Sequence, residues 1–84
     1  MSKIGLWAIP VVFETHEPGQ FQTVTTPLEA IHVLDGWWTK IDGPAFQMAI
    51  NACIDASRGD VDPENARAAF VNALIEGGVY IKPI

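Results

Sequence analysis

The chain begins with an apolar segment that is followed by a turn and a second short segment of mixed polarity. Residues 7–13 (WAIPVVF) are apolar and partly β-branched, which is typical of a buried strand. The sequence Glu-Pro-Gly-Gln then places Pro18 and Gly19 where a turn favours a fixed φ and a positive φ. Residues 21–24 (FQTV) follow as a second strand, so the pattern predicts a β-hairpin.

The register of this hairpin has two solutions. With a two-residue turn Phe13 lies opposite Val24, and with a longer loop it lies opposite Thr23. Because Pro10 cannot donate a hydrogen bond to a neighbouring strand, regular pairing is expected to begin only after it.

A change of hydrophobic period at Thr26 predicts the first helix. Thr26 is the expected N-cap, Pro27 stands at the first helical position, and Glu29 completes a capping box. Two C-terminal ends are consistent with the pattern, since Gly36 would end the helix at Asp35, whereas the apolar spacing continues for one more turn. The apolar stripe expected to face the core consists of Leu28, Ile31, Leu34 and Trp38.

Two further helices and a last strand are predicted in the second half of the chain. The second helix begins near Pro44 and ends at Gly59. The third has Asp62 as its N-cap and Pro63 in its first turn, and the sequence Glu-Gly-Gly ends it. Residues 79–82 alternate in polarity and are predicted to join the hairpin as a third strand.

These elements define an α+β fold, which we expect to form a single small domain over residues 1–84. The predicted sheet is small and mostly antiparallel, made of the hairpin and a C-terminal third strand, and three helices cover one of its faces. Hydrophobic residues make up 49% of the 84 residues, which suits one core and leaves no room for a second domain. The expected core is Phe13, Leu34, Trp38, Phe46, Ile50, Cys53, Phe70 and Leu74.

Several large apolar residues do not belong to the inward stripes. Trp37 is adjacent to Trp38 and therefore points elsewhere, and Val33 lies one helical turn before Trp37 on the same side. The hypothesis is that the surplus residues form a surface for a protein partner or a second copy: Trp7, Val33, Trp37, Val71 and Ile75. The alternative is that the helices are sheltered on two sides, by the sheet and by each other.

Charge and composition argue against several classes of function. The sequence has ten Asp and Glu residues but only five Lys and Arg residues, and these five are scattered singly. We therefore expect no nucleic-acid binding. The apolar run at residues 4–13 is too short to span a membrane and is not followed by a cleavage site. The single cysteine excludes an intramolecular disulfide and fits a reducing compartment, so a soluble cytoplasmic protein is expected.

Candidate residues for catalysis or metal binding are few. Cys53 falls on the inward stripe of the second helix, where a cysteine usually behaves as an inert small hydrophobe. Glu29 and His32 form one Glu-x-x-His pair, but di-metal bundle sites need two, and His16 lies far away in the sequence. The acidic residues at positions 55–64 do not fit a calcium loop. We therefore expect no catalytic residue, no metal and no cofactor.

Three segments resemble a known family. They are a tryptophan at the end of the first helix, GPAFQMAINAC at 43–53, and ENARAAFVNALIEGGVYI at 64–81. Together they are similar to the domain of unknown function 982 family of short bacterial proteins, over residues 12–81, although Thr39 stands where that family usually has proline. The resemblance implies nothing about activity, because the family has no established function. The matching positions are Trp38, Gly43, Pro44, Ala45, Phe46, Ala49, Cys53, Ala66, Arg67, Ala69 and Phe70.

The sequence therefore favours a small protein-interaction or regulatory module over an enzyme, with a homodimer as one form of the interaction. The alternative is a small-ligand-binding domain with a pocket between the helices and the sheet.

Overall fold

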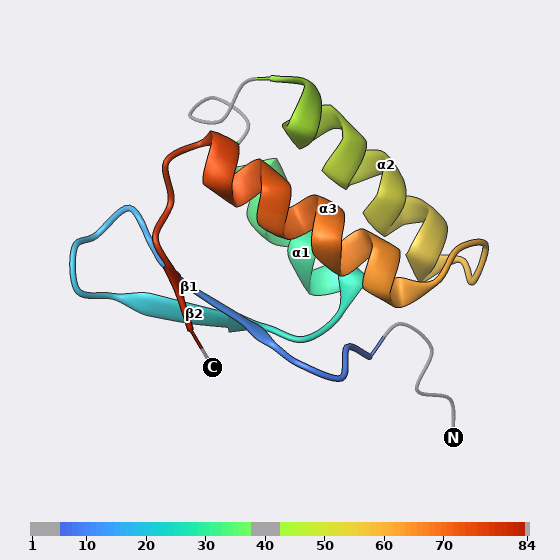
Figure 1. Ribbon diagram of the computed structural model, residues 1–84, viewed down its shortest axis with the longest axis horizontal. Coiled ribbons are helices and arrows are strands. Elements are labelled where there is room, and N and C mark those ends of the chain that lie inside the picture. The colour runs from blue at the N-terminus through green and yellow to red at the C-terminus, as the bar shows by residue number, and fades with distance from the viewer. Residues whose placement is uncertain (1–5, 38–42, 84) are drawn as a thin grey trace.

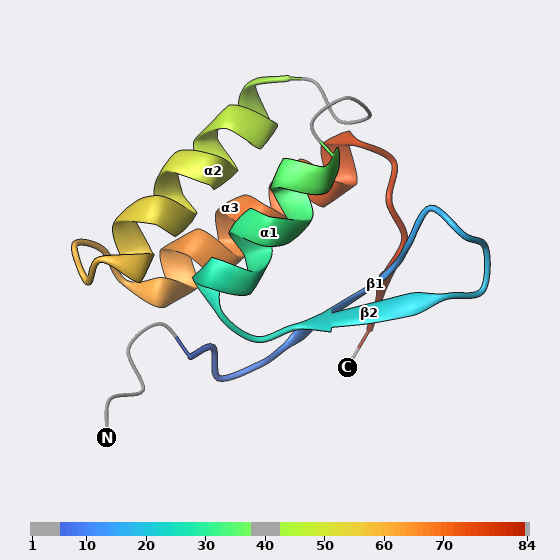
Figure 2. The ribbon, with the colours of Figure 1, turned by 180° about the vertical axis from the view of Figure 1, so that it is seen from behind.

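The computed structural model describes residues 6–37 and 43–83, without the side chain of Trp37, and confirms the α+β fold. Figures 1 and 2 show α1 and α3 over one face of the sheet, with α2 packed on α1 and α3 away from the sheet. The elements in chain order are β1 (Val11–Glu14), β2 (Phe21–Val24), α1 (Pro27–Trp37), α2 (Pro44–Ser57), α3 (Pro63–Glu76) and β3 (Ile81–Lys82).

The hairpin forms as predicted, but both predicted registers are wrong. Phe13 pairs with Gln22, because the loop is longer than either alternative assumed. The Thr15 amide donates to the Gln20 carbonyl at 2.7 Å, and the Glu17 amide donates to the Thr15 hydroxyl at 3.2 Å. This hydroxyl contact adds a local turn before the expected one, which shifts every pair of the hairpin.

The third strand joins the hairpin, as predicted, and it pairs antiparallel with β1, so the sheet has the order β2-β1-β3. Val12 lies opposite Lys82, and the Glu14 amide donates to the Tyr80 carbonyl at 2.9 Å. The regular part of β3 is only two residues long. The central strand therefore joins the beginning of the described chain to its end.

The first helix is capped as expected, with one difference. The Glu29 amide donates to the Thr26 hydroxyl at 3.1 Å, which confirms the N-cap. The Glu29 carboxylate accepts hydrogen bonds from the amide and hydroxyl of Thr25, one residue before the position that a capping box uses. The helix continues through Gly36 to Trp37, and the alternative end at Trp38 lies outside the described residues.

The predicted inward stripe of α1 is partly wrong. Leu28 is 57% exposed, whereas Ala30 and Val33 are buried beside Leu34. Because Pro27 is itself buried at the start of the helix, the buried face follows positions 27, 30, 33 and 34. This rotation takes Leu28 away from the core.

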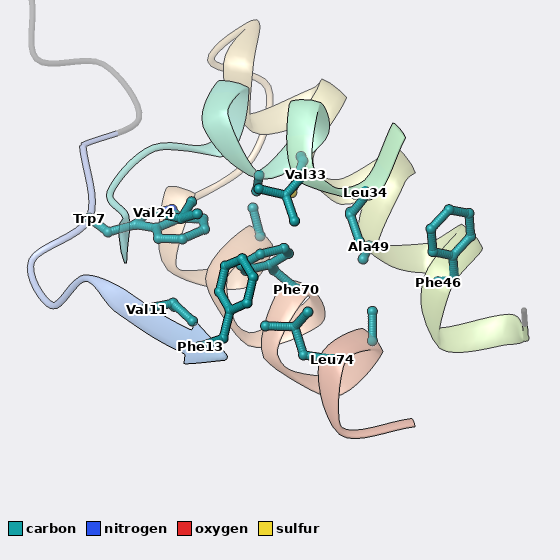
Figure 3. Packing of buried hydrophobic residues seen from close by; sticks show 14 of the residues in the cluster. Trp7, Val11, Phe13, Val24, Val33, Leu34, Phe46, Ala49, Phe70 and Leu74 are labelled. Carbon is teal, nitrogen blue, oxygen red and sulfur yellow. The ribbon is translucent and has the colours of Figure 1, made fainter. Parts of the chain in front are cut away.

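The core is centred on the ring of Phe70 in α3 (Figure 3). Its centroid lies 5.9 Å from that of Trp7 and 6.1 Å from that of Phe13, the second pair being edge-to-face. Of the expected core residues, Ile50 is half-buried against this cluster and Trp38 lies outside the described residues. The buried ones are Phe13, Leu34, Phe46, Cys53, Phe70 and Leu74.

The other two helices begin at the predicted prolines, and their caps differ in kind. The Asp62 carboxylate accepts a hydrogen bond from the Glu64 amide at 3.0 Å, a cap made within one segment. The N-cap of α2 is Gly43, which has no side chain to offer. Instead, the Glu76 carboxylate at the far end of α3 accepts a hydrogen bond from the Ala45 amide at 3.2 Å. A negative charge is therefore held at the positive end of α2.

The contact with Glu76 explains the glycine at position 43. Its φ of 163° is extended backbone that other residues also adopt, so conformation alone does not require glycine. A Cβ atom on Gly43 would, however, collide with the Glu76 carboxylate. Gly43 thus leaves space for a cap supplied by another helix.

We predict that Gly43→Ala and Gly36→Ala change stability in opposite directions. Gly43→Ala should lower the free energy of unfolding by about 1 kcal/mol, the typical value of a lost N-cap. Gly36→Ala should raise it by about 0.5–1 kcal/mol, because a Cβ there meets no atom within 4 Å and alanine favours a helix. Urea denaturation measures both, and a loss that persists for Gly43→Ala in a Glu76→Ala background would contradict the assignment.

Candidate functional site

A hollow of about 290 Å³ lies at the edge of the sheet, between α3 and the strands β1 and β3. Most of its lining residues are apolar, and the two basic ones are Arg67 and Lys82. We call it the α3–β3 hollow, and its lining includes Ile9, Val12, Arg67, Val71, Ile81 and Lys82.

Arg67 is held at this hollow by a contact with the chain before β1. Its Nε donates to the Ile9 carbonyl at 2.8 Å, so the guanidinium lies beside the incoming segment. The side chain is half-buried, and no carboxylate of the described residues pairs with it. The terminal nitrogens of the fork are therefore available to an anion.

Lys82 lines the same hollow from β3 and reaches onto the outer face of the sheet. Its Nζ lies 5.6 Å from the centroid of the Phe21 ring, within range of a cation–π contact. The Phe21 and Tyr80 rings meet edge-to-face at 6.3 Å, and they are 45% and 54% exposed. An exposed aromatic pair thus adjoins the hollow on the face of the sheet opposite the helices.

The structure corrects part of the predicted interaction surface. Trp7 and Val33 are 3% and 6% exposed and belong to the core, so placing them on a surface was wrong. Trp7 is buried because it covers Phe70, and Val33 because α1 is rotated from the predicted orientation. The side chain of Trp37 lies outside the described part of the chain.

The two α3 residues of that prediction do lie together. Val71 lines the hollow, and Ile75, one helical turn later, is 61% exposed. Arg67 stands one turn before Val71, so the three occupy one side of α3. The prediction missed Arg67, although the spacing of four residues could have indicated it. It also missed Ile9, Tyr80 and Lys82, which only the sheet order brings to the same edge.

A second hollow, of about 280 Å³, is lined by His16, Gln22, His32, Val33 and Gly36. The two histidines of the chain, 16 positions apart in the printed sequence, therefore face one space between the hairpin and α1. Within residues 6–37 and 43–83, no three His, Cys, Asp or Glu side chains are grouped so as to hold a metal ion. Its polar lining residues are two histidines and a glutamine, which do not form a recognisable metal-ligand set.

Cys53 is fully buried in α2 and belongs to the hydrophobic core. Desolvation raises the pKa of its thiol from 9.0 to about 11, because burial disfavours the charged thiolate. A buried neutral thiol is a poor nucleophile, so the position is chemically inert while the protein is folded.

The comparison with family models gives one result. The model described as "Protein of unknown function (DUF982)" matches residues 9–81, which is most of the chain. The chain is therefore a member of the DUF982 family. No curated protein and no solved structure matches it. Within the described residues, no helix is both long enough and apolar enough to cross a membrane.

Several residues of the family pattern have structural roles, at the Gly-Pro-Ala step and in the last helix. Gly43 and Ala45 form the cap that Glu76 completes, and Phe70 is the centre of the core. Arg67 differs from these, because its side chain reaches the α3–β3 hollow. Of the resembling positions in the described chain, Arg67 is the charged one that lines a hollow.

We predict that Cys53 resists alkylation until the protein unfolds. Iodoacetamide at pH 8 should modify the native protein far more slowly than the urea-unfolded protein, as measured by mass spectrometry. The raised pKa means that the folded state holds the thiol proton between pH 9.0 and about 11, where the unfolded state releases it. Stability from this source is therefore complete below pH 9 and decreases above it.

The control for this prediction is Cys53→Ala. The loss of unfolding free energy between pH 8 and pH 10.5 should be smaller in this variant than in the wild type, because the thiol no longer titrates. Equal losses in both proteins, or rapid native alkylation, would show that the thiol is not sheltered.

Proposed function

We propose that this protein is a protein-interaction module that binds an acidic, apolar segment of another protein at the α3–β3 hollow. The observation that carries the proposal is that Arg67 lies in a mostly apolar hollow of an otherwise acidic chain, while Lys82 lines the same hollow and carries its ammonium onto the adjoining outer face of the sheet. No acidic side chain of the described residues lines this hollow. An apolar centre bordered by charge is the usual composition of a protein docking site.

The surroundings of the hollow extend this apolar surface. Ile9 is 50% exposed on one side, and Ile75 lies further along α3. Tyr80 and Phe21 continue it onto the outer face of the sheet. Exposed large side chains of this kind, gathered at one edge, favour a partner that covers them.

The charges favour a foreign partner over a second copy at this surface. In a symmetric dimer built on this hollow, the same patch would face itself, which would bring Arg67 and Lys82 of both copies into one interface. Like charges brought together in this way oppose association. A segment with an aspartate or glutamate next to an aliphatic residue would satisfy both the fork of Arg67 and the apolar lining.

The volume favours a protein segment over a free small molecule. About 290 Å³ is at the lower limit of pockets that enclose small ligands, which span about 300–1,000 Å³. A space of this size suits one or two side chains of a longer segment whose remainder crosses the surrounding surface.

We predict that peptides selected from a random phage-displayed library on the immobilised protein will combine Asp or Glu with Ile, Leu or Val. Fluorescence anisotropy with a selected peptide should show binding at least about tenfold weaker for Arg67→Glu and for Lys82→Glu, because the charge reversal repels the carboxylate. Added salt should weaken the wild-type binding.

Arg58→Glu is the matched control. It makes the same change of charge at the exposed end of α2, away from the hollow, and should leave the affinity within about twofold. The melting temperature of each variant separates lost binding from lost folding, which matters for Arg67 because it also contacts Ile9. Selected peptides without acidic residues, or equal affinity for Arg58→Glu and Arg67→Glu, would refute the proposal.

A further inference from the structure

The segment before β1, residues 7–10, lies against α3 without belonging to a strand, and we call it the strap. The chain bends at Ala8 and Ile9, so regular strand pairing starts only after them. Trp7 is 3% exposed and its ring packs against Phe70 (Figure 3), whereas Ala8 and Ile9 are exposed. The strap is therefore anchored in the core mainly by the side chain of Trp7.

Few main-chain hydrogen bonds hold the strap in place. Within the described residues, its one main-chain bond joins the Trp7 amide to the Thr25 carbonyl at 2.8 Å. The Ala8 amide donates to the Glu64 carboxylate at 3.4 Å, which is longer than most hydrogen bonds of this kind. A segment with so few bonds is expected to open locally while the rest of the protein stays folded.

The indole of Trp7 both favours and opposes the closed position of the strap. Its ring contact with Phe70 favours closure, but its Nε1 is buried and has no acceptor among the described residues. A buried donor without an acceptor has lost its hydrogen bonds to water, and opening of the strap restores them. The edge-to-face contact of Phe13 with Phe70 does not involve the strap, so the sheet stays on α3 when the strap opens.

The strap and the α3–β3 hollow share a contact between two residues. Ile9 belongs to the strap and lines the hollow, and its carbonyl accepts the hydrogen bond from the Nε of Arg67, which lines the hollow from α3. With the strap closed, this bond orients the guanidinium, and Ile9 supplies part of the apolar lining. With the strap open, a bound segment would lose the contact with Ile9 and would have to order the arginine side chain itself. The hollow is therefore complete only when the strap is closed.

We propose that the strap opens and closes in the free protein and that an acidic, apolar segment bound in the α3–β3 hollow holds it closed. This inference rests on the proposed function, because it states how that site is regulated. Coupling of this kind is reciprocal, so a change that opens the strap weakens binding at the hollow, and binding at the hollow keeps Trp7 buried. Arg67 and Ile9 connect the two events.

Amide hydrogen exchange followed by NMR measures the opening of the strap in the full chain. In the free protein, the protection factor of the Trp7 amide should be at least about tenfold lower than that of the Phe70 amide, because local opening costs less free energy than unfolding. Urea should accelerate exchange at Phe70 much more than at Trp7, since local opening exposes little surface. Equal protection of the two amides would overturn the proposal.

The peptide selected on the immobilised protein tests the coupling. At a peptide concentration of about ten times its Kd, the Trp7 amide should exchange about tenfold more slowly, because binding to the closed state alone reduces the open population by this factor. Binding that leaves exchange at Trp7 within about twofold of the free protein would show that the peptide does not distinguish the two states of the strap. That result would overturn this inference and leave the proposed function standing, whereas the absence of any binding peptide would overturn both.

Arg67→Lys tests the residue that connects the hollow to the strap. Lysine keeps the charge that attracts the peptide but lacks the planar fork that can contact Ile9 and a carboxylate together. At the same saturation with peptide, the slowing of exchange at Trp7 should fall below about threefold. Arg58→Lys makes the same substitution at the exposed end of α2 and should keep the full effect. Circular dichroism checks that both variants fold, and undiminished slowing in folded Arg67→Lys would overturn the proposal.

Discussion

The packing of Phe70 against Trp7 and Phe13 is the interaction on which the rest of the structure depends. Phe70 comes from α3, Phe13 from the central strand and Trp7 from the segment before it, so one buried ring holds three parts of the chain together. Because α3 also has the most extensive contact with α2, it connects the sheet to the outer helix. The placement of Arg67, Val71 and Ile75 beside β3 follows from this anchor, since all are on the same helix. An aromatic contact in the core thus fixes the position of α3 at the edge of the sheet.

The helix caps set by neighbouring residues were predictable, whereas the hairpin register and several features set by distant residues were not. Asp62 caps α3 and Thr26 caps α1 because the donor and acceptor lie within three residues. The prediction of the hairpin register failed because it did not include one local contact. The Glu17 amide donates to the Thr15 hydroxyl, and this lengthens the loop. The inward face of α1 failed for a longer-range reason. Leu28 is as hydrophobic as Leu34, and only the burial of Pro27 against the core shows which of the two faces outward.

The same distinction applies to the candidate site. Val71 and Ile75 were recognisable as surplus residues because helical spacing sets them beside the inward stripe. Trp7 was wrongly assigned to the surface because the sequence around a large aromatic residue near a strand end looks the same whether the residue covers the core or binds a partner. Arg67 and Lys82 belong to segments that meet only when β3 returns to β1, so no spacing along the chain joins them. Likewise, the reason for glycine at position 43 is the Glu76 carboxylate, which belongs to the end of a different helix. The sequence around Gly43 does not reveal this contact.

The position of β1 between β2 and β3 also has a consequence for how the protein is made. During synthesis, β1 and β2 emerge before the three helices and can form the hairpin at once, since their contacts are local. The other side of β1 must wait, because its partner is the last described strand and leaves the ribosome after all three helices. Until then, Val12 and its neighbours present an unpaired strand side to the cell. The nascent chain is therefore exposed to misassociation along β1 while the three helices are being made, and the sheet is complete only once β3 has been added.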